Sequence, residues 1–399
     1  GGVSPKLIYE NKTMQYCGMV SGVRNLVGTA FHCWDKDNFG YFNFPFLVRD
    51  VSILSGACLA IKKKIFFDIG QFDAINTPSS HSDVDLSYKL LDNGYRCVYT
   101  PYTTLLHIGH LSLTLHEEKQ KVFVKDKSDI FLLKKWAKYV AYDPYFTDKM
   151  KNYLYHESPE NYKIYYNDKY KVEYNFGENL NSKNILLVTH DLSNSGAPIM
   201  LFNLAKTLKK NGYFVTIVSP KDGVLRKEYE KNGIIVIEDE LVLRQHDTFE
   251  RFSKNFDLVI ANTIVTWPVI KQHLENKNYI WWIHEAQLID VFAQNSEFLE
   301  TLKVANNIIT VSEYSKSYIN KYVDNTDIMV LPNGIKDIEI ITNQTQLNSS
   351  KKFVLIGSIE SRKGQDIFIK AIKELPETIR KNSEFHILGR TLDESYRRR

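Results

Sequence analysis

From residue 183 onward, short apolar runs alternate with helix-length amphipathic segments, and this alternation constrains the fold more than any other feature. The runs are NILLVTH, FVTIVSP, IIVIED, DLVIANT, YIWWIHE, NIITVS and DIMVLPN. Strands that alternate with helices are joined by right-handed crossovers and pair in parallel, so helices cover both faces of their sheet. The pattern therefore predicts an α/β fold with a Rossmann-like, doubly wound domain over residues 183–345.

A second structural unit is predicted to begin after the segment QLNSSKK. There, KFVLIGSI and FHILG have the character of strands, and QDIFIKAIKEL between them has the character of a helix. Two strands and one helix cannot enclose a hydrophobic core. We therefore interpret residues 346–399 as the beginning of a second Rossmann-like domain, and the chain as a piece of a longer protein.

The chain before residue 183 has a different character. Over residues 1–115, short apolar runs broken by Gly, Pro and Asn predict a mixed sheet packed against a few helices. Residues 116–182 are rich in Lys, Tyr, Glu and Asn, with FLLKKWAKYV as the best helix. We interpret this second stretch as a helical extension followed by a linker.

Composition excludes some classes of function. The 51 basic and 47 acidic residues leave a formal charge of +4, which is too small to indicate nucleic-acid binding. The four cysteines show no metal or redox spacing, and no apolar run is long enough to span a membrane, so we expect a cytoplasmic protein. The closing residues 397–399 are arginines; they are compatible with peripheral contact to the inner face of a membrane, although a solvated tail is the simpler interpretation.

Two loops of the 183–345 region carry candidate ligand-binding residues. In an open α/β sheet, ligands bind beyond the carboxyl ends of the strands. Gly196, in the loop DLSNSGAP before a helix predicted to begin near Pro198, would let the backbone approach a ligand there, although a tight turn also explains a small residue. His284 and Glu285 end the strand YIWWIHE on the same expected side, although a lone histidine is more often a hydrogen-bonded structural residue.

Two further motifs follow along the chain. Asn333 and Gly334, in LPNGI, most simply form a turn that leaves the sheet. Arg362 and Lys363, in SIESRKGQD, come just before a helix start. Two cations and the amides of a helix N-terminus would suit a diphosphate, although surface solvation is the default interpretation. No G-x-G-x-x-G dinucleotide fingerprint is present.

Together, these motifs indicate a protein family more specifically than any one of them does alone. The order and spacing of NILLVTHDLSNSGAP, IITVSEYS, IMVLPNGI and VLIGSIESRKGQDIFIKAI resemble family-4 retaining glycosyltransferases of GT-B fold, over roughly residues 183–399. The resemblance implies that the first domain chiefly takes the acceptor and that the second holds a nucleotide-sugar donor, without a cofactor. It implies that Lys363 contacts the donor diphosphate, that Gly196 lines the cleft and, more weakly, that His284 contributes.

The stretch HSDVDLSYKLLDNGY contains two aspartates one residue apart. As a purely structural helix start, Ser82 is the N-cap, Asp85 completes a capping box, and Leu86, Leu90 and Leu91 form the apolar stripe that ends at Gly94. That interpretation leaves no task for Asp83 beyond an interaction with the helix dipole.

The surrounding sequence, LSGACLAIKKKIFFDIGQFDAINTPSSHSDVDLSYKLLDNGYRCVYTPYTTLLHIGH, resembles the acceptor-side half of a family-2, GT-A fold inverting glycosyltransferase. The resemblance implies that Asp83 is the general base that deprotonates the acceptor hydroxyl. It also implies that His107 completes a site for a divalent metal, Mg²⁺ or Mn²⁺, with His110 as the alternative. Gly56 and Asp85 are the expected substrate contacts. Ser82 and Lys89 replace the glutamate and arginine that the family usually has there.

The metal-binding D-x-D pair of such enzymes should close an apolar strand. Asp35 and Asp37, in WDKDN, have no such strand before them, and we interpret them as loop acids. The nucleotide-binding half of this unit is therefore expected upstream of Gly1.

Together, the two resemblances predict a fragment of a bifunctional glycosyltransferase. It would transfer sugars from nucleotide-sugar donors to a growing saccharide or lipid-linked saccharide, in surface polysaccharide or lipopolysaccharide synthesis, and the isolated fragment is expected to show little transfer. A non-catalytic saccharide-binding or scaffold protein that kept these folds is the alternative. A nicotinamide-dependent dehydrogenase is disfavoured by the missing fingerprint.

Overall fold

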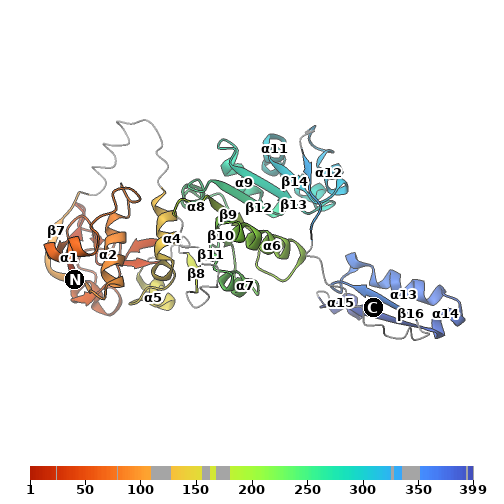
Figure 1. Ribbon diagram of the computed structural model, residues 1–399, viewed down its shortest axis with the longest axis horizontal. Coiled ribbons are helices and arrows are strands. Elements are labelled where there is room, and N and C mark those ends of the chain that lie inside the picture. The colour runs from red at the N-terminus through yellow and green to blue at the C-terminus, as the bar shows by residue number, and fades with distance from the viewer. Residues whose placement is uncertain are drawn as a thin grey trace. The chain divides into compact units, whose positions relative to one another are not determined.

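The computed structural model describes residues 1–23, 25–78, 80–108, 127–154, 162–167, 180–324, 328–334, 351–391 and 394–398. The chain divides into two compact units, Gly1–Asn333 and Gly334–Arg399 (Figure 1). The first unit contains the three segments that the sequence separates at residues 115 and 182. The second begins at Gly334, earlier than the predicted boundary at residue 345.

The large sheet of the first unit is the predicted doubly wound sheet. Its strands are ordered β15-β14-β13-β12-β9-β10-β11-β8, and all neighbours are parallel except the edge strand β8. Every apolar run predicted as a strand in this region forms one: β9 (Asn184–Val188), β10 (Phe214–Ser219), β11 (Ile235–Glu238), β12 (Leu258–Asn262), β13 (Tyr279–Ile283), β14 (Ile308–Thr310) and β15 (Met329–Val330).

Both faces of this sheet are buried, which explains why its strands are continuously apolar. Successive side chains of a strand point to opposite faces. In β9, accordingly, Leu186 and Val188 belong to one hydrophobic core while Ile185 and Leu187 belong to another. The flanking helices are α6 (Gly196–Lys210), α7 (Arg226–Lys231), α8 (Asp247–Ser253), α9 (Trp267–His273), α10 (Leu288–Phe292), α11 (Ser296–Val304) and α12 (Glu313–Ile319), with the short 3-10 helix η3 (Ile264–Thr266).

The N-terminal part of the first unit is built on a smaller mixed sheet, as predicted. Its order is β2-β1-β7-β5, with β6 also paired to β1. The central pair, β1 and β7, is parallel, and the outer strands are antiparallel to it. The strands are β1 (Gly2–Ile8), β2 (Met14–Tyr16), β5 (Arg49–Asp50), β6 (Ala60–Ile61) and β7 (Cys97–Leu106), and β3 (Met19–Ser21) pairs separately with β4 (Val27–Thr29).

Helix α2 (Ser82–Asp92) lies beside this sheet, after η1 (Tyr41–Phe46) and α1 (Lys63–Asp68). Leu86 and Leu90 are buried on its inner face, as the apolar stripe predicts. Gly94 has a φ of 73°, the left-handed geometry expected of a glycine stop. The predicted capping box is wrong, because Ser82 is already helical and the N-cap residue, His81, makes no side-chain cap.

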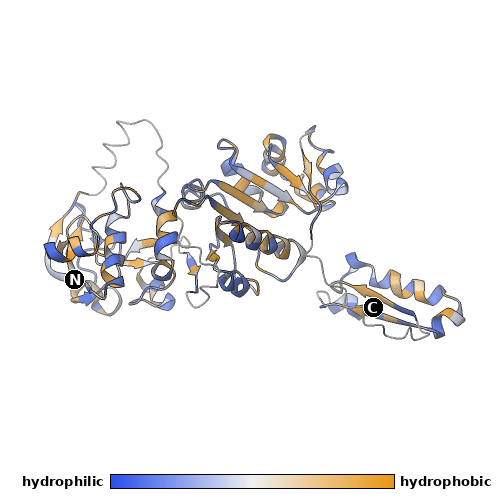
Figure 2. Ribbon diagram, in the orientation of Figure 1, coloured by the Kyte–Doolittle hydropathy of each residue, from blue (hydrophilic) through white to orange (hydrophobic). Residues whose placement is uncertain are grey.

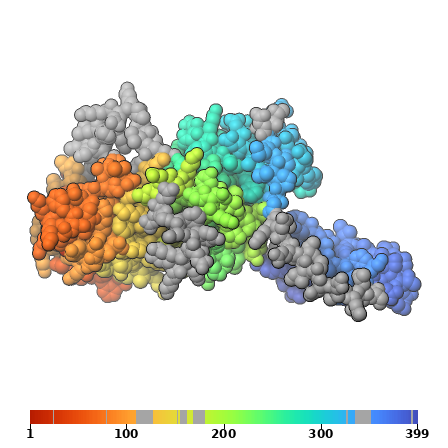
Figure 3. Space-filling model, in the orientation of Figure 1, coloured from red at the N-terminus to blue at the C-terminus, as the bar shows by residue number. Residues whose placement is uncertain are grey.

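Helix α4 (Ser128–Ala141) connects the two sheets of the first unit. It contains the predicted helical run FLLKKWAKYV, and its buried residues belong to the same core as Val84 of α2 and Ile237 of β11. Figure 3 shows the yellow surface of α4 and α5 (Asp148–Leu154) against the orange N-terminal part. Strand β8 (Lys163–Tyr165), in the stretch predicted to be a linker, pairs with β11. The described part of that stretch is therefore packed structure.

The second unit contains the two predicted strands and the helix between them. Strands β16 (Lys351–Ile356) and β17 (Ser383–Leu388) are parallel, and η4 (Ser361–Lys363), α13 (Gln365–Glu374), α14 (Glu377–Lys381) and α15 (Glu394–Arg397) accompany them. Among the described residues of this unit no hydrophobic side chain is buried, and Ile356 is 80% exposed. As predicted, these elements alone do not enclose a core.

Apolar residues are concentrated on the strands of both units. Figure 2 shows apolar colour on the central strands of the large sheet, and also on the strands and on one side of α13 in the second unit. Within the ranges that the structure describes, no helix combines the length and the apolar character needed to cross a bilayer.

Candidate functional site

The carboxyl ends of β9, β12 and β13 bring polar side chains together. These strands are neighbours, and the chain order reverses direction between β9 and β12. Ligands of doubly wound proteins bind at such a switch point, because the loops on either side diverge there. We call the residues that end or follow these strands the strand-end site: His190, Asn262, Thr263, His284 and Glu285.

His284 is held by a chain of hydrogen bonds that reaches α6. Its Nε2 lies 2.9 Å from Oδ1 of Asn262, and Nδ2 of Asn262 donates to the carbonyl of Ala197 at 3.1 Å. The ring of His284 also contacts Trp282, with ring centroids 4.7 Å apart. The predicted ligand histidine therefore lies at the strand end, in a fixed orientation.

Burial controls the charge of His284. Desolvation, together with the nearby His190, lowers the pKa of His284 to about 4. The imidazole is therefore neutral at physiological pH, and it can accept a hydrogen bond as well as donate one.

Glu285 lies beside His284 but turns toward the backbone. Its Oε2 accepts hydrogen bonds from the amides of Ile264, at 3.0 Å, and of His284, at 3.2 Å. Burial raises the pKa of this carboxyl above its ordinary value, and the backbone amides partly offset that effect. Glu285 thus ties the loop after β13 to the loop after β12, and its predicted substrate contact stays a prediction.

Thr263 has an unusual backbone conformation in the same loop, with φ 79° and ψ 164°. A residue with a Cβ rarely adopts such a φ, which costs on the order of 1–3 kcal/mol. The carbonyl of Thr263 accepts from Nε1 of Trp281 and from Oγ1 of Thr266, both at 2.9 Å, and its Oγ1 lies 3.2 Å from Nδ1 of His190. These contacts hold the strained loop in place.

Gly196 lies at the start of α6, on the same side of the sheet. An added Cβ at Gly196 would meet nothing within 4 Å, so the backbone there faces open space, and the predicted approach to a ligand stays a prediction. The helix begins at Gly196 instead of near Pro198, because Ser195 is the N-cap and Pro198 then occupies the third helical position.

Asn333 and Gly334 follow β15 at the boundary of the two units. Both are exposed and lie outside any helix or strand; no turn is assigned to residues 331–334, so the predicted turn stays a prediction. Asn333 is also a candidate substrate contact, and that role stays a prediction.

In the second unit, the two predicted cations lie beside the start of α13. Arg362 and Lys363 are exposed in η4, directly before that helix. Nη2 of Arg362 lies 3.0 Å from Oε1 of Glu360, whereas the side chain of Lys363 runs past Gly357, with Cδ 3.7 Å from a Cβ built there. The geometry fits the predicted cation pair at a helix start. Arg362 is paired with Glu360, so Lys363 is the cation better placed to bind an anion.

Asp83 in the N-terminal part lies against Gly56. Oδ2 of Asp83 accepts from the amide of Gly56 at 2.8 Å. A Cβ at Gly56 would lie 3.2 Å from that oxygen, so the glycine permits the close approach. The two residues that the resemblance places in one site are therefore in contact.

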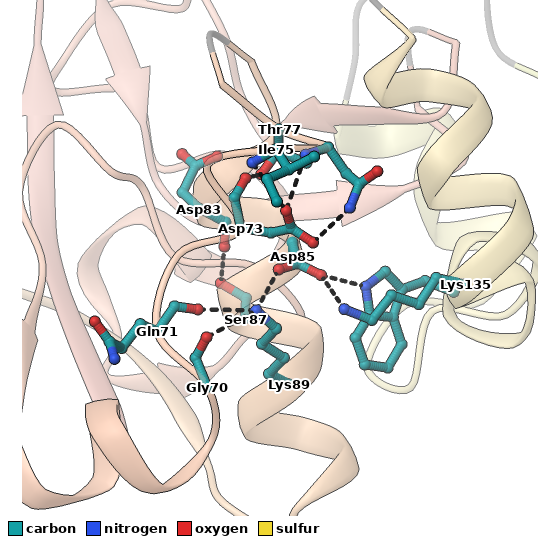
Figure 4. Close-up of polar contacts among 12 residues, drawn as sticks. Gly70, Gln71, Asp73, Ile75, Thr77, Asp83, Asp85, Ser87, Lys89 and Lys135 are labelled. Carbon is teal, nitrogen blue, oxygen red and sulfur yellow. Dashed lines mark hydrogen bonds and ion pairs between the residues drawn. The ribbon is translucent and has the colours of Figure 1, made fainter. Parts of the chain in front are cut away.

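The structure corrects the predictions made for Asp85. It was predicted both as a capping-box residue and as a substrate contact, but its side chain is fully buried. It lies 2.7 Å from Nζ of Lys89 and 3.0 Å from Nζ of Lys135, and Nε1 of Trp136 donates to it at 2.8 Å. Figure 4 shows Asp85 between the two lysines, while Asp83 lies apart from them. Asp85 therefore ties α2 to α4 and does not reach a substrate.

His107 follows β7, and its Nδ1 lies 2.7 Å from Oε1 of Gln15. In the part of the chain that the structure describes, no three His, Cys, Asp or Glu residues are grouped closely enough to hold a metal ion. The predicted role of His107 in a metal site stays a prediction, since its other ligands were expected upstream of Gly1, and His110 lies outside the described residues. Asp35 and Asp37 are loop acids, as predicted: Asp37 pairs with Lys36, and its amide donates to Asp35.

The structure adds three residues that the sequence reasoning missed: His190, Asn262 and Thr263. A signal for them was present, because each ends or follows a predicted strand in NILLVTH or DLVIANT. Ligands gather at the carboxyl ends of all strands in such a sheet, so these strand ends carry the same signal as the loops with glycine or an HE pair.

Two relatives of this chain match it over part of its length. An uncharacterised protein, y4gI, of Sinorhizobium fredii is 28% identical over 145 residues, which are 36% of this chain and 16% of that protein. The O-antigen biosynthesis protein RfbC of Myxococcus xanthus is 28% identical over 154 residues, 37% of this chain and 11% of that protein. The chain thus spans less than a fifth of the length of either relative.

Solved structures with a similar arrangement include Anabaena HepE in complex with UDP and glucose, at 19% identity, with 54% of this chain and 63% of that chain covered and a TM-score of 0.41. WaaG, a glycosyltransferase involved in lipopolysaccharide biosynthesis, is 14% identical, with 54% and 65% covered and a TM-score of 0.37. These scores are too low to assign a fold by themselves. The family model described as Glycosyl-transferase family 4, however, matches residues 181–347. The chain therefore carries a glycosyltransferase family 4 domain over these residues.

Proposed function

We propose that this chain belongs to a glycosyltransferase that transfers sugars from nucleotide-sugar donors to a growing saccharide in the synthesis of a surface polysaccharide or lipopolysaccharide. The observation that carries the proposal is the position of the strand-end site. It lies at the switch point of a sheet whose sequence matches glycosyltransferase family 4. The name of the Myxococcus relative, an O-antigen biosynthesis protein, supports the choice of pathway.

In this proposal the first unit binds a sugar at the strand-end site. A neutral imidazole and an open helix start suit a polyhydroxylated ligand, because sugar hydroxyls both donate and accept hydrogen bonds. Lys363, with Arg362 near it, is proposed to contact the diphosphate of the donor, since a helix start and cations together favour phosphate oxygens. The acceptor is a saccharide or a lipid-linked saccharide, and the reaction takes place on the cytoplasmic side of a membrane.

The N-terminal part is proposed to belong to a second transferase unit of the inverting kind. Asp83 would take the proton from the acceptor hydroxyl as that oxygen bonds to the anomeric carbon and the nucleoside diphosphate leaves. The contacts of Asp83 support this role, because hydrogen bonds from the amides of Gly56 and Val84 hold its carboxylate in place, and no ion pair of Asp83 is recorded within the described ranges.

Saturation-transfer NMR on the purified chain tests sugar binding at the strand-end site. With lipopolysaccharide core oligosaccharide as the probe, we expect transfer to the sugar protons that is lost in His284→Ala and kept in His386→Ala. His386 is a matched control because it is an exposed histidine of the second unit. Binding that survives His284→Ala unchanged would refute the placement of the sugar.

A separate experiment distinguishes the second transferase unit from a scaffold. Asp83→Asn is introduced into the protein in cells that make the polymer, with Asp92→Asn on the same helix as a control. Loss of polymer with the first variant alone supports catalysis by Asp83. Unchanged polymer synthesis would instead indicate that the N-terminal part binds saccharide without chemistry.

A further inference from the structure

The contacts of Asn262 determine which ring nitrogen of His284 carries the proton. Asn262 is the last residue of β12 and is fully buried. One end of its amide faces the carbonyl oxygen of Ala197, at 3.1 Å. A carbonyl oxygen only accepts hydrogen bonds, so the amide nitrogen of Asn262 must be the end that faces it.

The other end of the amide, Oδ1, then faces His284. Oδ1 is also only an acceptor, and it lies 2.9 Å from Nε2 of His284. Nε2 must therefore be the protonated nitrogen, and in a neutral ring Nδ1 then carries the lone pair. No described residue is recorded as a hydrogen-bond partner of that Nδ1.

We infer that Asn262 is a positioning residue that holds His284 in its neutral, Nε2-protonated tautomer and leaves Nδ1 to accept a hydrogen bond from a sugar hydroxyl. The sugar part of this inference rests on the proposed function. The tautomer part rests only on the two contacts of Asn262, which form a single chain from the start of α6 to the imidazole.

The surroundings of His284 agree with a neutral, fixed ring. Burial and the nearby His190 disfavour the imidazolium. The charged or titratable groups around it are His190, the Asp191 carboxylate 3.8 Å from His190, and Glu285 on its own loop. Trp282 packs against the ring and restricts its rotation. A ring held this way presents the same nitrogen to every ligand.

Nitrogen NMR of the full chain, labelled with ¹⁵N-histidine, tests the tautomer directly. The His284 signals are identified as those absent from His284→Gln. We expect one Nε2-protonated form between pH 6 and 8, with an Nε2 proton that exchanges slowly with solvent. A wild-type His284 that carries its proton on Nδ1 would overturn the inference, and this measurement needs no other variant to fold.

Variants then test whether Asn262 is the cause. Asn262→Ala should give averaged tautomer shifts and loss of the slowly exchanging Nε2 proton, while Asn262→Asp, which keeps an acceptor oxygen, should restore that proton. Asn184→Ala is the matched control, because Asn184 is a buried asparagine at the other end of the neighbouring strand β9, where it bonds Asp257. Its His284 signals should equal those of the wild type. Wild-type signals in Asn262→Ala would refute the role of Asn262.

Addition of core oligosaccharide to the same sample tests the second half of the inference. We expect the Nδ1 signal of His284 to shift with sugar while Nε2 stays protonated. A correct tautomer with no shift of Nδ1 would overturn the sugar contact, and with it the proposed sugar placement, while the positioning role of Asn262 would stand.

Discussion

Asp83 and Asp85 lie one residue apart at the start of α2, and their surroundings assign them different roles. The carboxylate of Asp83 accepts from backbone amides beside Gly56, whereas Asp85 is buried between two lysines and a tryptophan. The helix pattern correctly predicts that Leu86 and Leu90 are buried, because that depends on spacing alone; Leu91, the third leucine of the predicted stripe, is only half-buried. It cannot show that Asp85 bonds to α4, because those partners lie about fifty residues away in the chain.

Asp85→Asn should strongly destabilise the first unit. Removing one partner of a buried ion pair leaves the other charge uncompensated, at a cost of about 3–5 kcal/mol. Here Lys89 and Lys135 would both lose their carboxylate. Asp92→Asn on the same helix removes the charge from exposed contacts with Lys138 and Tyr139, so its effect should stay below about 1 kcal/mol. Urea unfolding followed by tryptophan fluorescence compares the two, and equal midpoints would contradict this assignment of Asp85.

His284 should make the stability of the first unit depend on pH. Its pKa is 6.5 in a model imidazole and about 4 in the folded protein, so the unfolded chain binds the proton first as the pH falls. Stability is therefore highest above pH 7 and decreases as the pH falls toward 4, by on the order of 2–3 kcal/mol for this group. Unfolding measured across this range should show that decrease reduced in His284→Gln and retained in His386→Gln.

At the scale of elements, the strands of the large sheet were predictable and the loops after them were not. Runs such as LLV and IWWI are apolar because both faces of the sheet are buried, and this leaves a plain signal in the sequence. The strained backbone of Thr263 leaves none, because its φ is imposed by bonds from Trp281 and Thr266. The start of α6 was misplaced for a related reason: proline is accepted at more than one position of a first turn.

Gly389 should be essential to the second unit, and Gly357 should not. A Cβ at Gly389 would lie 1.7 Å from the carbonyl oxygen of Gly357, whereas a Cβ at Gly357 meets only the side chain of Lys363, at 3.7 Å. Gly389→Ala must push apart the backbones after β16 and β17, which we expect to cost at least about 1–3 kcal/mol. Hydrogen exchange of the β16 and β17 amides should accelerate at least tenfold in Gly389→Ala and little in Gly357→Ala. Equal exchange would show that the two glycines are equivalent.

At the scale of the whole chain, the two units differ in how they bury apolar surface. The first has extended cores on both faces of its large sheet. The second leaves Ile356, Ile367 and Leu388 more than half exposed. The sequence predicted this contrast, because it follows from the number of strands and helices available to cover one another. It did not predict that α4 and β8 pack with the large sheet, since that depends on contacts between residues far apart in the chain.

Limited trypsin digestion should therefore cut the second unit first. Elements with little buried surface open at low free-energy cost, and lysines such as Lys370 and Lys373 lie on α13. Mass spectrometry should show early cleavage after residue 351 and a resistant fragment that still contains β9 to β14. Early cuts within those strands or α6, with the second unit intact, would contradict this order of stability.

The shared core around α4 determines where a stable shorter fragment of this protein can begin. Expression of the family-4 segment alone, from residue 181, would omit both β8 and the helix α4 with Trp136 and Leu132. It would leave the edge of β11 unpaired and expose apolar side chains of the shared core. Such a fragment should be prone to aggregate. A fragment that starts at α4 would keep the leucine and tryptophan side chains that cover this apolar surface. The side of α4 that α2 covers would still be exposed in this fragment, and polar substitutions there should keep it in solution.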